Sequence, residues 1–236
     1  STRWRIVALF FTHALAAGVI HTRIPDLQEA MSISEGQLGL VLMGQPLGGL
    51  AMFLFSSAII ERFGPRRTIL AVLPIVIITA ALSTVLLTPF ALFALLAING
   101  TGFSLSNIAM NVEADRVEAG MDQRVMNTCH GAWSVGFLFT SLLGAALRGL
   151  GVSPEIHLWS MVPLLLALLL FVVVPMVPMP PRAYTGEKAK KLALPTLATL
   201  GLVAFGLGAG LTEGASRAWS IIYLRDSFDV PAFVES

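Results

Sequence analysis

The sequence predicts an all-α protein that crosses a membrane several times, and three observations support that prediction. First, 56% of its 236 residues are hydrophobic and 12% are charged, with a mean hydropathy of +0.80; soluble domains are roughly 45–50% apolar and about 25% charged. Second, apolar segments of about 20 residues, the length that spans a bilayer as a helix, recur along the chain. Third, positive residues gather in alternate breaks between those segments.

Seven such segments follow one another, separated by short charged or Pro/Gly-rich breaks, and each is predicted to form one transmembrane helix. In chain order they run from about Arg5 to Ile24, Ser34 to Ile60, Thr68 to Leu87, Phe90 to Val112, Met126 to Leu147, Leu158 to Val177, and Pro195 to Leu224.

Positive residues predict the orientation, because they favour the cytoplasmic side of a membrane. With the amino terminus inside, only Arg23, Arg148 and Arg225 lie outside, and Arg217 falls within the seventh segment. The remaining eleven lie inside: Arg3, Arg5, Arg62, Arg66, Arg67, Arg116, Arg124, Arg182, Lys188, Lys190 and Lys191. We therefore predict a cytoplasmic amino terminus.

The longest polar break divides the chain into three parts. Residues 1–178 are predicted to form a six-helix transmembrane bundle, and residues 179–193, with a proline cluster and three lysines, a cytoplasmic linker. Residues 194–236 hold the seventh helix and an outer tail, the start of an incomplete second half. We expect activity to require the missing second-half helices or another copy of the chain.

Composition also argues against several classes of function. A formal net charge of +1 leaves no basic excess for nucleic-acid binding. The single Cys129 excludes an intramolecular disulfide, and no Cys/His cluster with zinc spacing accompanies it, so no metal or cofactor is expected. Arg3 and Arg5 before Ala14-Leu15-Ala16 resemble a signal peptide, but a first transmembrane helix is the simpler interpretation, since His13 interrupts the apolar core.

Small residues recur at four-residue spacing in two segments. They are Gly44 and Gly48 in the second segment, and Gly206, Gly210 and Gly214 in the seventh. Such spacing lets helix backbones approach closely where lipid supplies no hydrophobic drive. We predict packing seams; the alternative is that these seams slide during a conformational change.

The loop after the second segment carries a family resemblance. Its sequence, Ser57-Ala-Ile-Ile-Glu61-Arg62-Phe63-Gly64-Pro65-Arg66-Arg67, resembles the signature Gly-x-x-x-Asp-Arg-x-Gly-Arg-Arg of the major facilitator superfamily, in the family's place. Ser57 replaces the first glycine, Glu61 the aspartate, and Pro65 interrupts the basic run. The resemblance implies a transporter of two six-helix halves, the first built from two three-helix repeats.

The same resemblance implies a conformational charge latch at the cytoplasmic face, in which the acidic residue meets neighbouring helix ends. Its candidates are Glu61, Arg62, Arg66, Arg67, Glu113, Asp115 and Arg116. The alternative is that the loop only determines topology, with its arginines near anionic lipid.

Two further stretches resemble a bacterial subgroup of the superfamily typified by proteins of the YbjJ kind. One begins at His130-Gly131-Ala132-Trp133, and the other runs from Glu213 to Ser220. Ala218 stands where an acid often precedes the tryptophan in that subgroup. The resemblance implies a bacterial inner (plasma) membrane location.

Ionisable side chains at membrane depth are the next clue, because each costs at least about 2.5–3.5 kcal/mol at the helix centre without a partner or a water-filled cavity. His13 lies near the middle of the first segment, whereas His21 and Arg23 are expected at its outer mouth. An imidazole exchanges protons near neutral pH, so His13 is a proton-coupling candidate. The alternative is a hydrogen-bonded core histidine.

Amide side chains predict the wall of a polar solute cavity. Asn107 and Asn111 share one face of the fourth segment, and Asn99 lies in the same segment. Gln45 lies beside Pro46 at an expected helix break. Interhelical hydrogen bonds, worth roughly 0.6 kcal/mol each, explain these residues equally well.

Two pairs complete the candidate site. His130 and Trp133, at i and i+3, suit a stacking surface beside a hydrogen-bonding group, although an interfacial aromatic belt is the alternative. Glu213 and Arg217, at i and i+4, suit an ion pair in the seventh helix. Glu213 is the second proton-coupling candidate, with a structural pair as the alternative.

These observations predict a secondary active transporter that moves a small solute, coupled to protons, by alternating access through a site near the bilayer midplane. Two rival functions stay open. A membrane-embedded hydrolase needs a nucleophile and a base at one depth, and Ser134 and His130 are the only such neighbours. A non-transporting scaffold or sensor would explain an absent second half.

Overall fold

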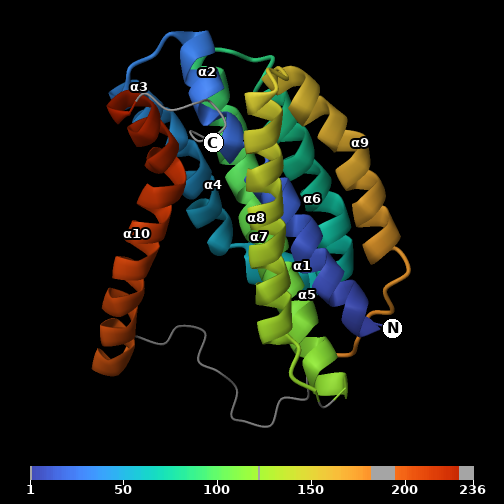
Figure 1. Cartoon of the computed structure of the whole chain (residues 1–236). Coiled ribbons are helices and arrows are strands. Elements are labelled where there is room, and N and C mark those ends of the chain that lie inside the picture. Colours follow the sequence, from blue (N-terminus) through green and yellow to red (C-terminus); the bar gives the residue numbers. More distant parts are fainter. Residues whose placement is uncertain (1, 122, 182–194, 229–236) are drawn as a thin grey trace.

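The computed structural model describes residues 2–121, 123–181 and 195–228, apart from the side chains at positions 217 and 218. These ranges contain helices and no strand (Figure 1), which confirms the all-α prediction. The helices are α1 (Thr2–Gly18), η1 (His21–Arg23), α2 (Ile24–Met31), α3 (Glu35–Leu42), α4 (Gly44–Phe53), α5 (Ser56–Phe63), α6 (Pro65–Leu82), α7 (Pro89–Met121), α8 (Met126–Gly149), α9 (Pro154–Val173) and α10 (Leu197–Ser227).

The described helices are long and apolar enough for a polytopic membrane protein. Six of them, with α1 and α2 joined as Thr2–Met31, pass on length and composition, and the bent series α3–α4–α5 makes a seventh. The spans match the predicted segments to within about five residues, with two exceptions: the first span continues past Ile24 to Met31, and α7 continues past Val112 to Met121. The predicted linker, residues 179–193, lies mostly outside the described residues.

The second span is not the continuous helix that the sequence predicted. It bends by 62° between Glu35–Phe53 and Ser56–Phe63. At the bend, Ser56 Oγ donates to the Phe53 carbonyl at 3.0 Å and the Phe55 N–H bonds to the Met52 carbonyl at 3.0 Å, three residues back. Local bonds of this kind compete with the i−4 helical pattern and turn the chain.

A second break falls at Met43, between α3 and α4, just before Gln45 and Pro46. Proline is tolerated in the first turn of a helix because the N–H groups there have no helical acceptor. The expected break at Gln45 and Pro46 therefore lies a few residues earlier than the proline itself.

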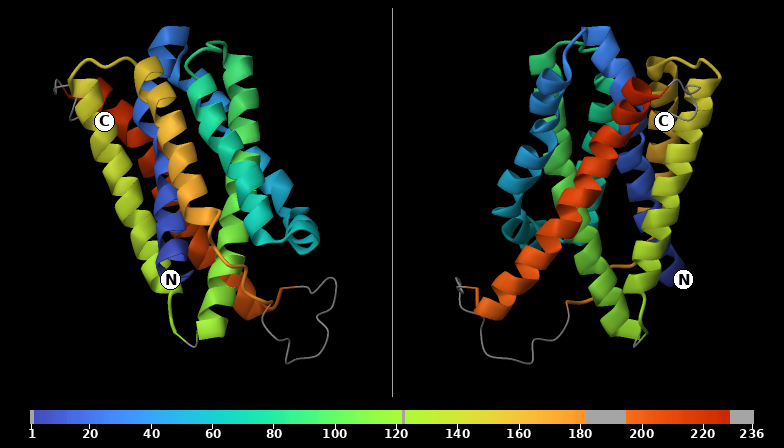
Figure 2. Two further views of the ribbon diagram at one scale, coloured as in Figure 1. Left: turned by 90° about the vertical axis from the view of Figure 1, so that its right-hand side faces the viewer. Right: turned by 60° about the vertical axis from the view of Figure 1, so that its left-hand side comes forward.

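Helices α1 to α9 pack into one body around a shared apolar core (Figure 2). In it, α4 and α6 pack against α7, α1 packs against α8, and α9 lies against α6 and α1. Phe10, Leu73 and Leu165 are among its fully buried side chains. The elements that carry the central polar candidates, α1, α7 and α8, therefore meet inside this body.

Glycines let α4 and α7 touch backbone to backbone. A Cβ at Gly48 would overlap the backbone of Ala97, and a Cβ at Gly100 would overlap the backbone of Gln45. Gly44 is closed off in the same way by the Phe93 carbonyl. The predicted packing seam at Gly44 and Gly48 is confirmed.

Helix α10 is attached differently from the rest. It crosses obliquely beside the body (Figure 2) and meets it at its C-terminal end, where Ile222 is buried with Ile24 and Leu38 and Trp219 packs over Gly39. Its first half is exposed, with Phe205 82% accessible. A Cβ at Gly206, Gly210 or Gly214 would have no heavy atom within 4 Å among the described residues.

Candidate solute and proton site

His13 is the centre of a buried polar contact between three helices. It is 1% exposed on α1, and its Nε2 lies 3.0 Å from Ser106 Oγ on α7. On the other side of the ring, Trp133 Nε1 of α8 donates to His13 Nδ1 at 3.2 Å. The Phe103 ring lies 4.8 Å from the imidazole. One imidazole therefore links α1, α7 and α8.

These contacts determine the tautomer that we assign to His13. An indole N–H is only a donor, so Nδ1 must accept and carry no hydrogen. The proton then resides on Nε2, which donates to Ser106 Oγ, and that hydroxyl donates to the Phe103 carbonyl at 3.0 Å. In this arrangement the imidazole is neutral and both of its nitrogens are hydrogen-bonded.

Aromatic rings extend this cluster along α8. Trp133 stacks on Phe137 with 5.3 Å between ring centroids and 15° between planes. His130 is exposed, and its ring meets the edge of Phe10 at 5.4 Å. His130 and Trp133 thus both lie on the side of α8 that contacts α1.

Asn99 and Gln45 join helices to one another. Gln45 Nε2 donates to Asn99 Oδ1 at 3.1 Å, and Asn99 Nδ2 lies 3.0 Å from both the Val76 carbonyl and Thr79 Oγ1. Asn99 is 3% exposed. The pair therefore links α4, α7 and α6 by hydrogen bonds. For these two residues the structure favours interhelical hydrogen bonding, the alternative to a cavity wall.

Asn107 and Asn111 lie in a different environment, on an open stretch of α7. Asn111 Nδ2 donates to the Asn107 carbonyl at 2.9 Å, within the same helix. Both amides line a groove of about 540 Å³ near the bend of the second span. Its other lining residues are Phe53, Ile108, Val112, Asp115, Arg116 and Pro181. These two asparagines are therefore accessible to a solute.

The α10 candidates are described only in part. Glu213 is exposed on α10 and lies away from the His13 contact, because that part of the helix is not packed against the body. The Arg217 side chain lies outside the described residues, so the predicted pair with Glu213 stays a prediction.

The signature loop forms the turn between α5 and α6, where Gly64 has a φ of +77° that favours glycine. Glu61 is exposed, and among the described residues it makes no ion pair with Arg62 or Arg67, which are also exposed. The latch around Glu61 stays a prediction.

Near the signature loop, the described arginine hydrogen bonds are made with the C-terminal end of α9 and not with Glu61. Arg66 donates to the carbonyls of Val173 and Val174, and Arg5 donates to the Phe171 carbonyl at 2.8 Å. A guanidinium at a helix C-terminus satisfies free carbonyls and complements the helix dipole. Two arginines from α1 and α6 therefore hold the last turn of α9.

Two acidic latch candidates on α7 differ in burial. Glu113 is 1% exposed; its Oε1 accepts from the Met179 N–H at 3.4 Å, and its Oε2 has no hydrogen-bond partner among the described residues. Asp115 is half-buried and, with Arg116, lines the groove beside the asparagines.

Sequence reasoning missed a buried ionic cluster at the opposite end of the body. Arg23 is 1% exposed rather than at an open mouth; its Nε donates to His157 Nδ1 at 3.1 Å and its Nη1 meets Asp26 at 3.3 Å. Arg148 reaches the other oxygen of Asp26 at 3.2 Å. The signal available in the sequence was His157, an ionisable residue directly before the sixth apolar segment.

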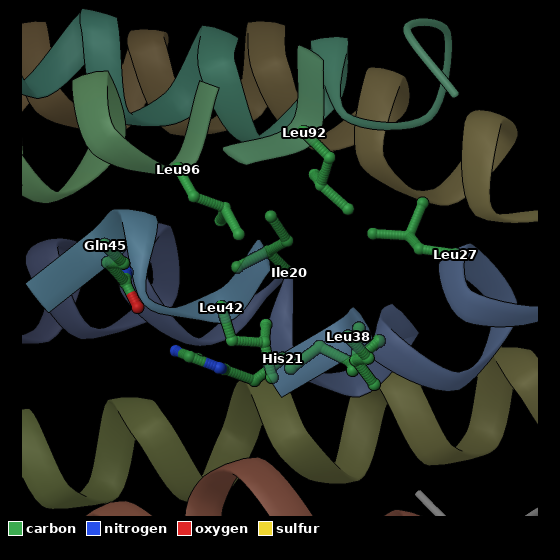
Figure 3. Close-up of a pocket in the computed structure, with 9 residues that line it drawn as sticks. Ile20, His21, Leu27, Leu38, Leu42, Gln45, Leu92 and Leu96 are labelled. Atoms are coloured by element: carbon green, nitrogen blue, oxygen red, sulfur yellow. The ribbon is translucent and has the colours of Figure 1, made fainter. Parts of the chain in front are cut away.

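A small cavity lies where the end of α1 meets α2, α3 and α7. Its volume, about 20 Å³, holds one water molecule at most. The polar side chains His21 and Gln45 lie among leucine and isoleucine side chains there (Figure 3). The cavity is too small for an organic solute.

The geometry also bears on a hydrolase and on a metal site. Ser134 Oγ donates to the backbone carbonyl of His130 at 3.1 Å, not to its imidazole. Within the described residues, no three His, Cys, Asp or Glu side chains are grouped as metal ligands. This arrangement lacks the nucleophile-to-base hydrogen bond of a hydrolase.

Similarity to known proteins agrees with the fold. An uncharacterized MFS-type transporter of Yersinia pestis is 25% identical over 161 residues, which is 68% of this chain and 42% of that protein. The uncharacterized transporter y4wD of Sinorhizobium fredii is 28% identical, covering 95% of this chain and 60% of the relative. Membrane protein MosC of Rhizobium meliloti is 27% identical, with 91% and 52% covered.

The chain thus spans about half the length of these curated relatives. No solved structure matches it significantly. The family model of the Major Facilitator Superfamily matches residues 6–235. The subgroup typified by YbjJ stays a prediction, whereas the resemblance to the superfamily is confirmed. Because the match covers nearly the whole sequence, this multi-pass membrane chain belongs to the Major Facilitator Superfamily of transporters.

Proposed function

We propose that the chain is part of a secondary active transporter that moves a small polar solute across a bacterial inner membrane and couples that movement to protons. The observation that carries the proposal is the His13 contact. A titratable ring is buried where α1, α7 and α8 meet, and both of its nitrogens are used. The amino terminus is cytoplasmic, on the count of positive residues.

Protonation of His13 has a direct structural consequence. A second ring hydrogen on Nδ1 would face the Trp133 N–H, and two donors cannot bond to each other. The link between α1 and α8 then breaks, and a buried imidazolium requires water or a new acceptor. Protonation therefore changes the relative free energy of two bundle arrangements, which is the requirement for coupling.

The accessible polar groups indicate the chemistry of the solute. Asn107 and Asn111 offer amide donors and acceptors, and His130 and Trp133 offer a ring nitrogen and an aromatic face. These groups suit a small solute that bears hydroxyl or carboxylate groups. Asn99 and Gln45 act in helix packing in this arrangement.

The attachment of α10 supports alternating access. At its C-terminal end, Arg225 Nη2 donates to Gln28 at 3.1 Å, and its Nη1 lies 3.5 Å from Glu29, so α10 covers the outer ends of α2 and α3. At the other end of the body, the groove beside Asn111 is open. This combination fits a state that is closed outside and open inside.

The test is solute flux in proteoliposomes, made with the longest chain that the source gene encodes and screened over small sugars and organic acids. We expect flux that follows an imposed proton gradient, and loss of that dependence in His13→Gln and in Glu213→Gln. Glu155→Gln, an exposed acid in the first turn of α9, is the matched control and should transport normally.

Two outcomes would contradict the proposal. If gradient-dependent flux is unchanged in both His13→Gln and Glu213→Gln, neither His13 nor Glu213 couples transport to protons. The absence of flux for any tested solute, from a folded protein of full length, would favour a non-transporting scaffold or sensor.

A further inference from the structure

We infer that a groove between α1 and α8, on the side of α1 opposite His13, binds an anionic phospholipid with its headgroup against Arg3. The groove has a volume of about 500 Å³ and is open to the surroundings. It is lined by Arg3, Trp4, Val7, Ala8, Phe11 and Ala132.

The groove lies on the face of α1 that points away from His13. Its α1 residues recur at three- and four-residue steps, so they form one face of the helix. His13 points the other way, to α7 and α8. Near its N-terminal end, α1 is visible between α8 and α9, which both pack against it (Figure 1). The groove therefore opens on the outside of the body that the described helices α1 to α9 form, where lipid can reach it in a membrane-spanning chain.

The inner wall of the groove suits an acyl chain. Val7, Phe11 and the two alanines Ala8 and Ala132 are apolar, and the small alanine side chains leave the hollow between the helices. Phe11 lies 6.3 Å from the ring of Phe139, which is 52% exposed and continues the apolar surface along α8. An extended hydrocarbon chain buries apolar area along this path without any polar partner.

The N-terminal end of the groove suits an anionic headgroup. Arg3 is exposed, and its one described hydrogen bond, from Nη1 to Gln123 Oε1 at 3.2 Å, leaves most of its five N–H donors available. Arg124, which precedes α8, is also exposed. Guanidinium groups bind phosphate oxygens with two parallel hydrogen bonds, so they match a phosphodiester.

Trp4 marks the level of the headgroups. It is 41% exposed, and an indole ring prefers the boundary between hydrocarbon and water. The Arg5 guanidinium lies 4.6 Å above the Trp4 ring while it donates to the last turn of α9, which holds the ring at this depth. Charge, aromatic ring and apolar wall thus occur in the order in which a phospholipid presents phosphate, glycerol and acyl chain.

The test uses the purified chain in a neutral detergent, titrated with dioleoylphosphatidylglycerol or dioleoylphosphatidylcholine and observed by native mass spectrometry. We expect tighter binding of the anionic lipid, and about fivefold weaker binding in Arg3→Gln, the factor that one basic residue contributes near anionic lipid. Arg67→Gln removes the same charge from an exposed site in the first turn of α6, outside the groove, and should weaken binding less than Arg3→Gln does.

A second variant tests the acyl path. Ala132→Phe fills the hollow without changing charge, so it should weaken binding of both lipids while the melting temperature in lipid-free detergent stays unchanged. Equal affinity for the two lipids, or equal losses in Arg3→Gln and Arg67→Gln, would overturn the inference. So would displacement of the lipid by glycerol phosphate at equal concentration, which would reveal a site for phosphate alone. The inference does not depend on transport.

Discussion

Two regions of this molecule carry glycines at the same spacing and use them in opposite ways. In the body formed by α1 to α9, Gly44 and Gly48 lie against the backbone of α7. On α10, Gly206 and Gly210 have no described neighbour within 4 Å of an added Cβ. The spacing therefore predicts a surface suited to close helix contact, and the tertiary structure decides whether that contact is made.

The body and α10 also differ in how many buried charged and polar contacts they contain. The body contains a buried arginine, Arg23, bridged through Asp26 to Arg148, and a buried histidine contact at His13. Helix α10 meets the body through a few side chains near Ile222 and Arg225. An element with few buried contacts changes position at low cost, so we expect α10 to move and the body to stay intact.

The largest effect is expected from Asp26→Asn, which removes the carboxylate between two arginines of the body. Arg23 is 1% exposed and would lose its counter-charge, which should lower the free energy of unfolding by about 3 kcal/mol. Thermal unfolding in detergent measures this loss. Glu29→Gln, on the same short helix but 63% exposed, is the control, and equal shifts in both variants would contradict the buried role of Asp26.

A matched glycine pair tests the contrast itself. Gly48→Ala places a methyl group against the Ala97 backbone and should destabilise the body by about 1–3 kcal/mol. Gly210→Ala adds a methyl group with no described heavy atom within 4 Å and introduces a better helix former, so the stability of this variant should be unchanged or raised by up to about 1 kcal/mol. Similar melting temperatures for the two variants would show that the α4–α7 seam is loose.

The smallest effect on stability is expected from Arg225→Gln. Two of its partners, Glu29 and Asp226, are exposed, whereas the hydrogen bond to Gln28, which is 4% exposed, is partly buried, so the loss should be about 1 kcal/mol. Hydrogen exchange should nevertheless increase at the C-terminal end of α10 and at α2, and not in α7. Unchanged exchange at α2 would mean that Arg225 does not hold α10 in place.

Much of the fold was predictable from the sequence because membrane helices need long apolar runs; six of the seven runs form helices long and apolar enough to span a membrane, and the remaining run, the second, forms the bent series α3–α4–α5. The bend at Ser56 was not predictable from hydropathy. It arises from the Ser56 hydroxyl, which bonds the Phe53 carbonyl inside an otherwise mostly apolar stretch. Hydropathy predicts which segments can span a membrane, whereas local hydrogen bonds determine where the backbone of a span bends.

The site was predictable only in its parts. His13 and Trp133 were each identified, as separate candidates, but the bond between them joins residues 120 positions apart and depends on how α1 packs against α8. Arg23 and His157 were missed as a pair for the same reason, being 134 residues apart. Residue type indicates what chemistry a side chain can perform, and tertiary packing decides which of these side chains come into contact.

The measurement that tests alternating access most directly is the distance between α2 and the C-terminal end of α10. Spin labels at Ala30→Cys and Tyr223→Cys, both exposed sites, are placed in a Cys129→Ala background in the longest chain that the gene encodes. Proton-coupled alternating access predicts two distances whose proportions change with pH, and proportions that do not depend on pH in His13→Gln. One distance that stays the same at every pH and with every solute would contradict it.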